Sequence, residues 1–223
     1  MNTPRSSLWQ ARPLAIVVNE GVLLSRIYRL ESKPSSDDIC EGRLGMAATP
    51  GALMIEDYLF ADDGDVPNNP RLPLIVYRGA LETGGDAAAS CVALFDRNGW
   101  TGAWKNGVYL HHHYHSSAHE VLGIATGWVR VRLGGESGRT VELRAGDVVV
   151  IPAGVAHKNE GASPDLLVVG AYPRGQSADM RSPSAADRAR ALPQIAAVPL
   201  PAGDPVHGPS GPLLERWRAA ERG

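Results

Sequence analysis

The sequence predicts an all-β protein whose strands form an antiparallel sandwich or jelly roll. About eight short strand-like segments follow Gly99, and glycine-containing turns separate them. In residues 128–133 (WVRVRL), one face of the predicted strand carries two valines and a leucine, and the other carries a tryptophan and two arginines. This alternation is expected of a strand buried on one face. Residues 147–152 (DVVVIP) are apolar on both faces, which is typical of a strand covered on each side. This pattern favours a jelly roll over alternating helices and strands.

The elements before these strands are fewer. Residues 52–61 form a short apolar run, residues 61–70 (ADDGDVPNNP) are rich in turn formers, and residues 72–81 predict a strand. Residues 86–97 space their apolar side chains as a helix does. Asp86 is a suitable N-cap, and Asn98 and Gly99 follow as a stop signal. We therefore predict one helix before the barrel.

The later strands are predicted in succession, each bounded by glycine or a turn. They cover residues 100–106, 107–115, 119–126, 128–135, 139–146, 147–154, 155–161 and 165–173.

The two ends of the chain are predicted to lie outside the barrel, which we assign to residues 51–180. Residues 1–50 have little periodicity. They are either an extra strand with a linker, or an over-extended reading frame whose natural start is Met46 or Met54. Residues 181–223 predict a tail with helices near 184–191 and 211–221, which packs on the outer surface or an edge of the barrel. Leu213, Leu214 and Trp217 share one face of the second helix.

Composition argues against several classes of partner. The chain has 22 basic and 24 acidic residues and no run of like charges, so we expect neither a nucleic-acid nor a membrane partner. Cys40 and Cys91 are far apart and have no partner motif, so the sequence implies no disulfide framework. The apolar run at residues 14–24 is interrupted by polar residues and is a poor signal peptide. We predict a cytoplasmic protein.

Residues 107–127 hold five of the seven histidines. His113 and His115 are separated by one residue, so an extended strand points both rings to the same face. Glu120 follows after room for a tight turn, and His157 lies in a second strand-like segment. Three imidazoles and one carboxylate make a site for a divalent transition metal.

Tyr109 and His111 lie four and two residues before His113, so a regular strand would place them on the same face as the candidate ligands. His111 is predicted to line the pocket, although it is also able to replace a ligand. Tyr109 is either a substrate contact or a core tyrosine. His112 and Tyr114 should point away from the metal and pack. His119 should lie at the surface or support a ligand through a hydrogen bond.

The histidine spacing also matches a known pattern. Gly107, His113, His115, Glu120 and Gly127 fit the first motif of the cupin superfamily, and Gly146, Pro152, Gly154 and His157 fit the second. The second motif departs from the family at its last position, where Gly161 replaces asparagine. We expect this departure to touch a loop and not a ligand. The chain thus resembles the RmlC-like cupins, which implies a double-stranded β-helix around a metal.

The resemblance extends to one branch, the YjlB-like cupins, from about Tyr58 to the end of the chain. It is carried by DDGDVPNNPRLPLIVYRGAL, NGWTGAWKNGVYLHHHYHSSAHEVLG, AGDVVVIPAGVAHKN, VVGAYPRGQ and VPLPAGDPVHGPSGPL. Residues 1–50 do not resemble the branch, which favours the later start. Because this branch has no settled activity, the resemblance implies a fold more firmly than a function.

The ligand set leaves a net charge of about +1 on a divalent ion and about two open positions in a six-coordinate geometry. Fe(II), Mn(II), Ni(II), Co(II), Cu(II) and Zn(II) are all compatible. The resemblance implies a metal-dependent enzyme, of the oxygenase type, acting on a small oxygen-bearing metabolite. A non-catalytic small-molecule-binding cupin and a metal-dependent isomerase are the alternatives. No separate proton-transfer pair is assigned, and the resemblance implies a homodimer.

Overall fold

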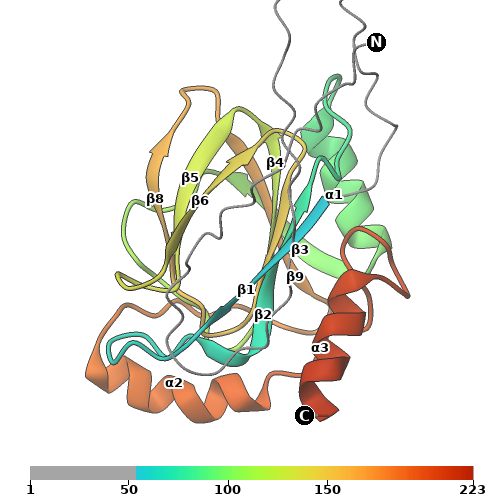
Figure 1. Ribbon diagram of the computed structural model, residues 1–223. Coiled ribbons are helices and arrows are strands. Elements are labelled where there is room, and N and C mark those ends of the chain that lie inside the picture. Colours follow the sequence, from blue (N-terminus) through green and yellow to red (C-terminus); the bar gives the residue numbers. More distant parts are fainter. Residues whose placement is uncertain (1–53, 223) are drawn as a thin grey trace, which may run out of the picture. The chain divides into compact units, whose positions relative to one another are not determined.

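Two antiparallel sheets face each other in the computed structural model, which describes residues 54–222 (Figure 1). The extension predicted for residues 1–50, and with it the choice of start, lies outside these residues. One sheet has the order β1-β2-β7-β4-β9-β3 and the other β6-β5-β8. The predicted jelly roll is confirmed. The strands are β1 (Met54–Phe60), β2 (Asn69–Arg78), β3 (Trp100–Asn106), β4 (Glu120–Thr126), β5 (Trp128–Leu133), β6 (Arg139–Arg144), β7 (Val148–Ile151), β8 (His157–Ala162) and β9 (Leu167–Pro173).

The space between the sheets is filled by alternate side chains of both. On β5, Val129, Val131 and Leu133 are buried there while Arg130 is exposed, as the alternation predicted. The six-stranded sheet contributes every second residue to the same core. Its inner face includes Val149 and Ile151 on β7, Leu122 and Ile124 on β4, and Val168 on β9.

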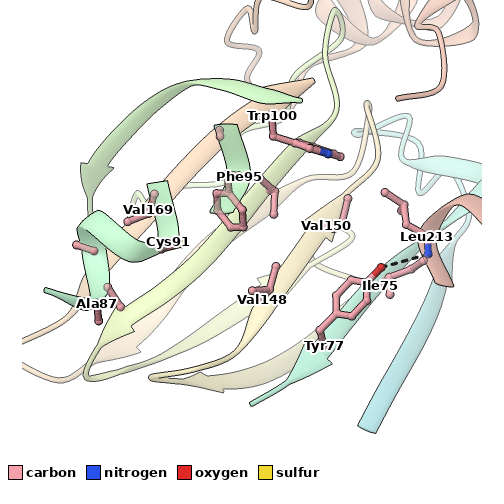
Figure 2. Packing of buried hydrophobic residues seen from close by; sticks show 14 of the residues in the cluster. Ile75, Tyr77, Ala87, Cys91, Phe95, Trp100, Val148, Val150, Val169 and Leu213 are labelled. Atoms are coloured by element: carbon pink, nitrogen blue, oxygen red, sulfur yellow. Dashed lines mark hydrogen bonds between the residues drawn. The ribbon is translucent and has the colours of Figure 1, made fainter. Parts of the chain in front are cut away.

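The outer face of the six-stranded sheet carries a second core, shown in Figure 2. Val148 and Val150 of β7 and Val169 of β9 point into it, so β7 is covered on both faces as predicted. Two helices supply the opposite side, α1 (Ala87–Arg97) and α3 (Pro212–Arg222). This sandwich of sheet and helices fixes the strands that carry the candidate site.

Helix α1 begins and ends where its sequence indicates. The Asp86 side chain accepts a hydrogen bond from the Ala89 N–H, and Asn98 is the C-cap. Cys91 and Phe95 are buried against the sheet, directly over Gly123 of β4.

The C-terminal tail packs on this framework. Helix α2 (Ala185–Ala197) runs past Pro193 and is longer than the predicted 184–191. It continues because Ala191 and Ile195 pack on Val66, Tyr114 and Ala156, so tertiary contacts outweigh the lost backbone hydrogen bond. Figure 1 shows α2 across the lower end of the sheets.

Helix α3 buries the face that was predicted, with Leu213, Leu214 and Trp217. The Tyr77 hydroxyl accepts from the Leu213 N–H at 3.1 Å, which Figure 2 marks, and donates to Asp204 at 2.6 Å. Within residues 54–222, no helix has the length and apolar character needed to cross a membrane.

The strand predicted for residues 107–115 is wrong. Only isolated bridges form there, from His113 to His157 and from Tyr114 to Arg181. The chain leaves β3, at the edge of one sheet, and crosses to β8 in the other. There the Asn159 N–H also donates to the Tyr109 carbonyl at 2.8 Å, but these few bonds do not form a continuous ladder. Asn106 begins the departure, because its side-chain oxygen accepts the Gly107 N–H at 2.8 Å.

Candidate metal centre

Three buried histidines from two distant segments converge between the sheets. One ring nitrogen each of His113, His115 and His157 lies within 4.8 Å of the other two. The backbones of His113 and His157 exchange hydrogen bonds of 3.2 and 2.9 Å, which brings their ring centroids to 4.1 Å. The chain is extended enough from His113 to His115 for both rings to reach the centre, although it forms no regular strand. This cluster can hold a metal ion.

Each histidine is oriented by a backbone carbonyl on its far side. Nδ1 of His113 lies 3.4 Å from the His111 carbonyl oxygen, and Nδ1 of His157 lies 3.3 Å from that of Val155. Nδ1 of His115 forms a short contact with the Asp179 carbonyl oxygen. Because a carbonyl only accepts, the proton belongs on each Nδ1. Each Nε2 is left with a lone pair for a metal, the usual arrangement at histidine-ligated centres.

Glu120, the first residue of β4, joins the cluster from the inner face of the large sheet. Its Oε2 lies 3.4 Å from His115 Nε2 and 3.3 Å from His157 Nε2. The group of ligand atoms that all lie within 4.8 Å of one another consists of the three histidine nitrogens and does not include Glu120. In the described part of the chain, Glu120 Oε2 and His115 Nε2 are buried without a conventional hydrogen-bond partner. Such atoms are costly unless something satisfies them, and a divalent cation between them fits that need.

The electrostatics of the cluster suit cation binding. Burial, and then the neighbouring His157 and His115, lower the pKa of His113 to about 3, so this imidazole is neutral. Burial opposes ionisation of Glu120, but His115 and His157 hold the pKa of its carboxyl below the ordinary value. Burial likewise opposes protonation of His115, yet the Glu120 carboxylate keeps the pKa of His115 raised. An ionised carboxylate therefore faces the imidazoles.

A cavity of about 250 Å³ opens beside the histidines. Tyr172 of β9 and Trp104 of β3 form part of its wall, and the Trp104 indole N–H donates to the Tyr172 hydroxyl at 3.0 Å. Burial, and then the Glu120 carboxylate, raise the pKa of Tyr172, so its phenol stays protonated. Sequence reasoning missed Tyr172. The alternation of Val168, Gly170 and Tyr172 along β9 was the available signal, because it places all three on the inner face.

Tyr109 and His111 lie at the rim of this cavity. Tyr109 lines its mouth, is 48% exposed and meets the His113 ring edge-on at 5.1 Å. Its contact with a substrate stays a prediction. His111 is exposed, stacks on Tyr109 at 5.3 Å and is not among the lining residues. It serves the centre through its backbone carbonyl, beside His113 Nδ1.

The remaining histidines of the segment point elsewhere. The His112 Nε2 lies 3.2 Å from Glu136, away from the cluster. His119 is buried, whereas one predicted position for it was the surface. Its Nδ1 accepts the Ala153 N–H at 3.0 Å and its ring packs on Trp217 at 4.6 Å. His119 is therefore a core residue, because the tail covers the face to which it points.

Asp179 anchors the turn that carries His115, which the sequence did not indicate. Its carboxylate accepts hydrogen bonds from the backbone and hydroxyl of Ser116 and Ser117 and from Arg181. Burial opposes its ionisation, but these donors lower the pKa of Asp179 to about 2. The segment before α2 thus reaches a candidate ligand directly.

Gly161, where the second motif departs from the family pattern, lies in strand β8 and not in the predicted loop. The register shifts there, since Arg130 pairs with Gly161 and Val131 with Asn159. The Gly161 N–H donates to the Asn159 side chain at 2.7 Å. The departure therefore coincides with a bulge, and His157 remains in the cluster.

Comparison with known proteins places these observations in a family context. Residues 103–169 match the model of the cupin domain. The chain is 44% identical over 162 residues to the uncharacterized protein YjlB of Bacillus subtilis strain 168, covering 73% of this chain and 96% of that one.

The chain is also similar to solved structures over part of its length. Procruciferin, an 11S globulin of Brassica napus, is 12% identical with a TM-score of 0.30, over 51% of this chain and 23% of the globulin. Acireductone dioxygenase from Bacillus anthracis, with a cadmium ion in its active centre, is 16% identical with a TM-score of 0.30. That match covers 41% of this chain and 62% of the dioxygenase.

Proposed function

This chain belongs to the cupins, in the branch of the uncharacterized protein YjlB, and from that premise we propose that it is a metal-dependent enzyme of the oxygenase type. Its substrate is a small oxygen-bearing metabolite. The observation that carries the proposal is the meeting of His113, His115 and His157 with Glu120 at the wall of a cavity. A metal held only for structure has no need of an adjoining pocket.

The metal is a divalent transition ion: Fe(II), Mn(II), Ni(II), Co(II), Cu(II) and Zn(II) all suit imidazole and carboxylate donors. When bound, such an ion supplies a Lewis acid for substrate oxygens and, if it is redox-active, a partner for dioxygen. His113, His115 and His157 would hold it through Nε2, and Glu120 would supply the negative charge.

The chain's own groups prepare the pocket for an oxygen ligand. The Tyr172 hydroxyl, protonated and adjacent to Glu120, is available to donate a hydrogen bond to an oxygen bound beside that carboxylate. Trp104 holds this hydroxyl in place through its indole N–H. Leu122, on the inner face of β4, gives the cavity an apolar wall close to Glu120.

Metal content tests the first part of the proposal. Untagged protein purified without chelator should contain about one transition metal per chain, allowing for partial loss. His157→Ala removes a ligand and should lower this content at least about tenfold. His111→Gln, which changes an exposed ring outside the cluster, is the matched control and should keep the metal. Equal metal in both variants would contradict the assignment.

Turnover tests the second part. Protein loaded anaerobically with Fe(II) should consume oxygen when candidate diols, keto acids or sugars are added, and His157→Ala should not. The same candidate substrates are also tested with other divalent ions, and analysis of the products detects reactions that consume no oxygen. Tight binding of a ligand without turnover under any metal would instead identify a non-catalytic binding protein.

A further inference from the structure

The wall of the cavity indicates what kind of molecule the centre receives. We infer that the ligand is an oxygen chelator with an uncharged, apolar body, such as an enediol or hydroxyketone without a remote carboxylate or phosphate. This inference rests on the proposed metal centre and adds the substrate class to it. Three features of the cavity support it: the apolar surface beyond the metal end, the distribution of charge and the use of the polar groups.

Beyond the histidines, the surface is apolar or aromatic. Leu122 and Val108 belong to the core between the sheets and form the inner wall. The Trp104 indole packs against Gly170, where an added Cβ would fall 2.1 Å from it. Tyr109 and Met180 stand at the mouth, with exposed fractions of 48% and 54%. A ligand body that enters here replaces water with carbon contacts.

Charge is confined to the metal end. Among the lining residues that the structure describes, Glu120 is the one carboxylate and Lys105 is the one lysine or arginine. Lys105 pairs with Val169, whose side chain lies in the outer core, whereas Asn106 pairs with Val168 of the inner core. Directly paired residues share a face of the sheet, so the Lys105 ammonium is directed away from the cavity. A remote anionic group on the ligand would find no cationic partner there.

Two of the uncharged polar atoms of the wall are already engaged. The Asn106 side-chain oxygen accepts the Gly107 N–H, and the Tyr172 hydroxyl accepts the Trp104 N–H. The Tyr172 ring meets the His115 ring edge-on at 6.0 Å, so this hydroxyl belongs to the metal end of the cavity and not to its far wall. With about 250 Å³, the cavity is also small, so a charged group held inside it would lose water and meet no cationic side chain.

Three hydroxamates that share one chelating group test the inference by calorimetry on the Zn(II)-loaded full chain. Benzohydroxamate has an apolar body, its para-carboxy analogue adds a remote carboxylate, and acetohydroxamate lacks the ring. We expect benzohydroxamate to bind at least about tenfold more tightly than either of the other two, because it alone fills the cavity without a charge. Carboxylated hydroxamate that binds as tightly as benzohydroxamate would overturn the inference.

Two exposed positions provide matched variants that add the same charge. Met180→Lys places a cation at the mouth and should strengthen binding of the para-carboxy analogue about tenfold relative to benzohydroxamate. Leu59→Lys, at a similarly exposed position on β1 outside the cavity, should leave the ratio unchanged. An unchanged ratio in Met180→Lys would contradict the inference.

The outcomes separate the two proposals. Protein that binds neither Zn(II) nor any hydroxamate would overturn the metal centre and this inference together. Binding of Zn(II) and all three hydroxamates with equal affinity would overturn the ligand class alone.

Discussion

At each candidate ligand, the imidazole nitrogen turned away from the centre lies beside a backbone carbonyl, and the other nitrogen is turned toward the centre. Backbone carbonyls of His111, Asp179 and Val155 face Nδ1 of His113, His115 and His157. These contacts set the tautomer before a metal arrives, which lowers the cost of organising the ligands. The Asp179 carbonyl differs from the other two because it comes from a distant segment, and the carboxylate of the same residue fixes its position.

We therefore expect Asp179→Ala to weaken metal affinity by about 10- to 100-fold, since loss of its carboxylate releases the turn that carries His115. Competition with a chelating dye measures this affinity. Asp187→Ala is the control, because Asp187 approaches the same Arg181, at 3.6 Å, without touching the His115 turn. Equal affinity in the two variants would show that the backbone alone positions His115.

At the scale of helices and strands, both faces of the six-stranded sheet are packed. Its inner face presents Glu120, Leu122 and Tyr172 to the site, and its outer face receives α1 and α3. A fault in the outer packing therefore acts on strands that also carry site residues. Gly123, between two inner-facing residues of β4, lies directly under Cys91 and Phe95 of α1.

Gly123→Ala should destabilise the protein by about 1–3 kcal/mol, because the added methyl is forced into α1. Its Cβ would lie 2.5 Å from Cys91 Sγ and 3.0 Å from the Phe95 ring. Urea unfolding gives the change in the free energy of unfolding. Gly107→Ala is the control, since its Cβ would meet nothing nearer than 3.9 Å. If both variants unfold at the same urea concentration, α1 adjusts more freely than its packing indicates.

Helix α3 contributes its largest side chain to the outer core. Trp217 is fully buried, donates from Nε1 to the Pro73 carbonyl at 2.8 Å and packs on His119. We expect Trp217→Ala to lower the free energy of unfolding by about 3–5 kcal/mol, by loss of burial and creation of a cavity. Thermal or urea unfolding checks this value, with exposed Arg218→Ala as the control. A loss no larger than in that control would mean that the tail is dispensable for stability.

For the whole molecule, binding at the proposed centre is linked to folding, because its ligands come from segments that only the fold brings together. Zn(II) at a free concentration of about 100 times its Kd should raise the free energy of unfolding by about 2.7 kcal/mol. Melting curves with Zn(II), and after addition of a chelator, measure the effect and its reversal. His157→Ala should respond much less, and an equal response would place the bound ion elsewhere.

Some expectations for the whole protein stay predictions. The homodimer, the cytoplasmic location and the nature of residues 1–50 are predictions from the sequence, and the structure of residues 54–222 does not test them. The predicted boundaries at residues 51–180 and 181–223 also stay predictions, although α3 packs on the six-stranded sheet and α2 packs on Val66, Tyr114 and Ala156.

By itself, the sequence determined the class of fold and the identity of the candidate ligands. Strand alternation such as that of Val129, Val131 and Leu133 is local, and so is the cap at Asp86, so both are readable from neighbouring residues. The spacing of His113, His115 and Glu120, with His157 in a second motif, named the four side chains that the fold brings together.

Only the tertiary structure decided how those side chains are supported and what surrounds them. The path of residues 107–115 depends on a crossing between two sheets, and the burial of His119 depends on Trp217, nearly a hundred positions away in the chain. The contact of Asp179 with His115 likewise joins segments far apart in sequence. Contacts of this kind leave no periodic pattern in the sequence, because they depend on how the strands are arranged in the sheets and on the surface that the tail covers.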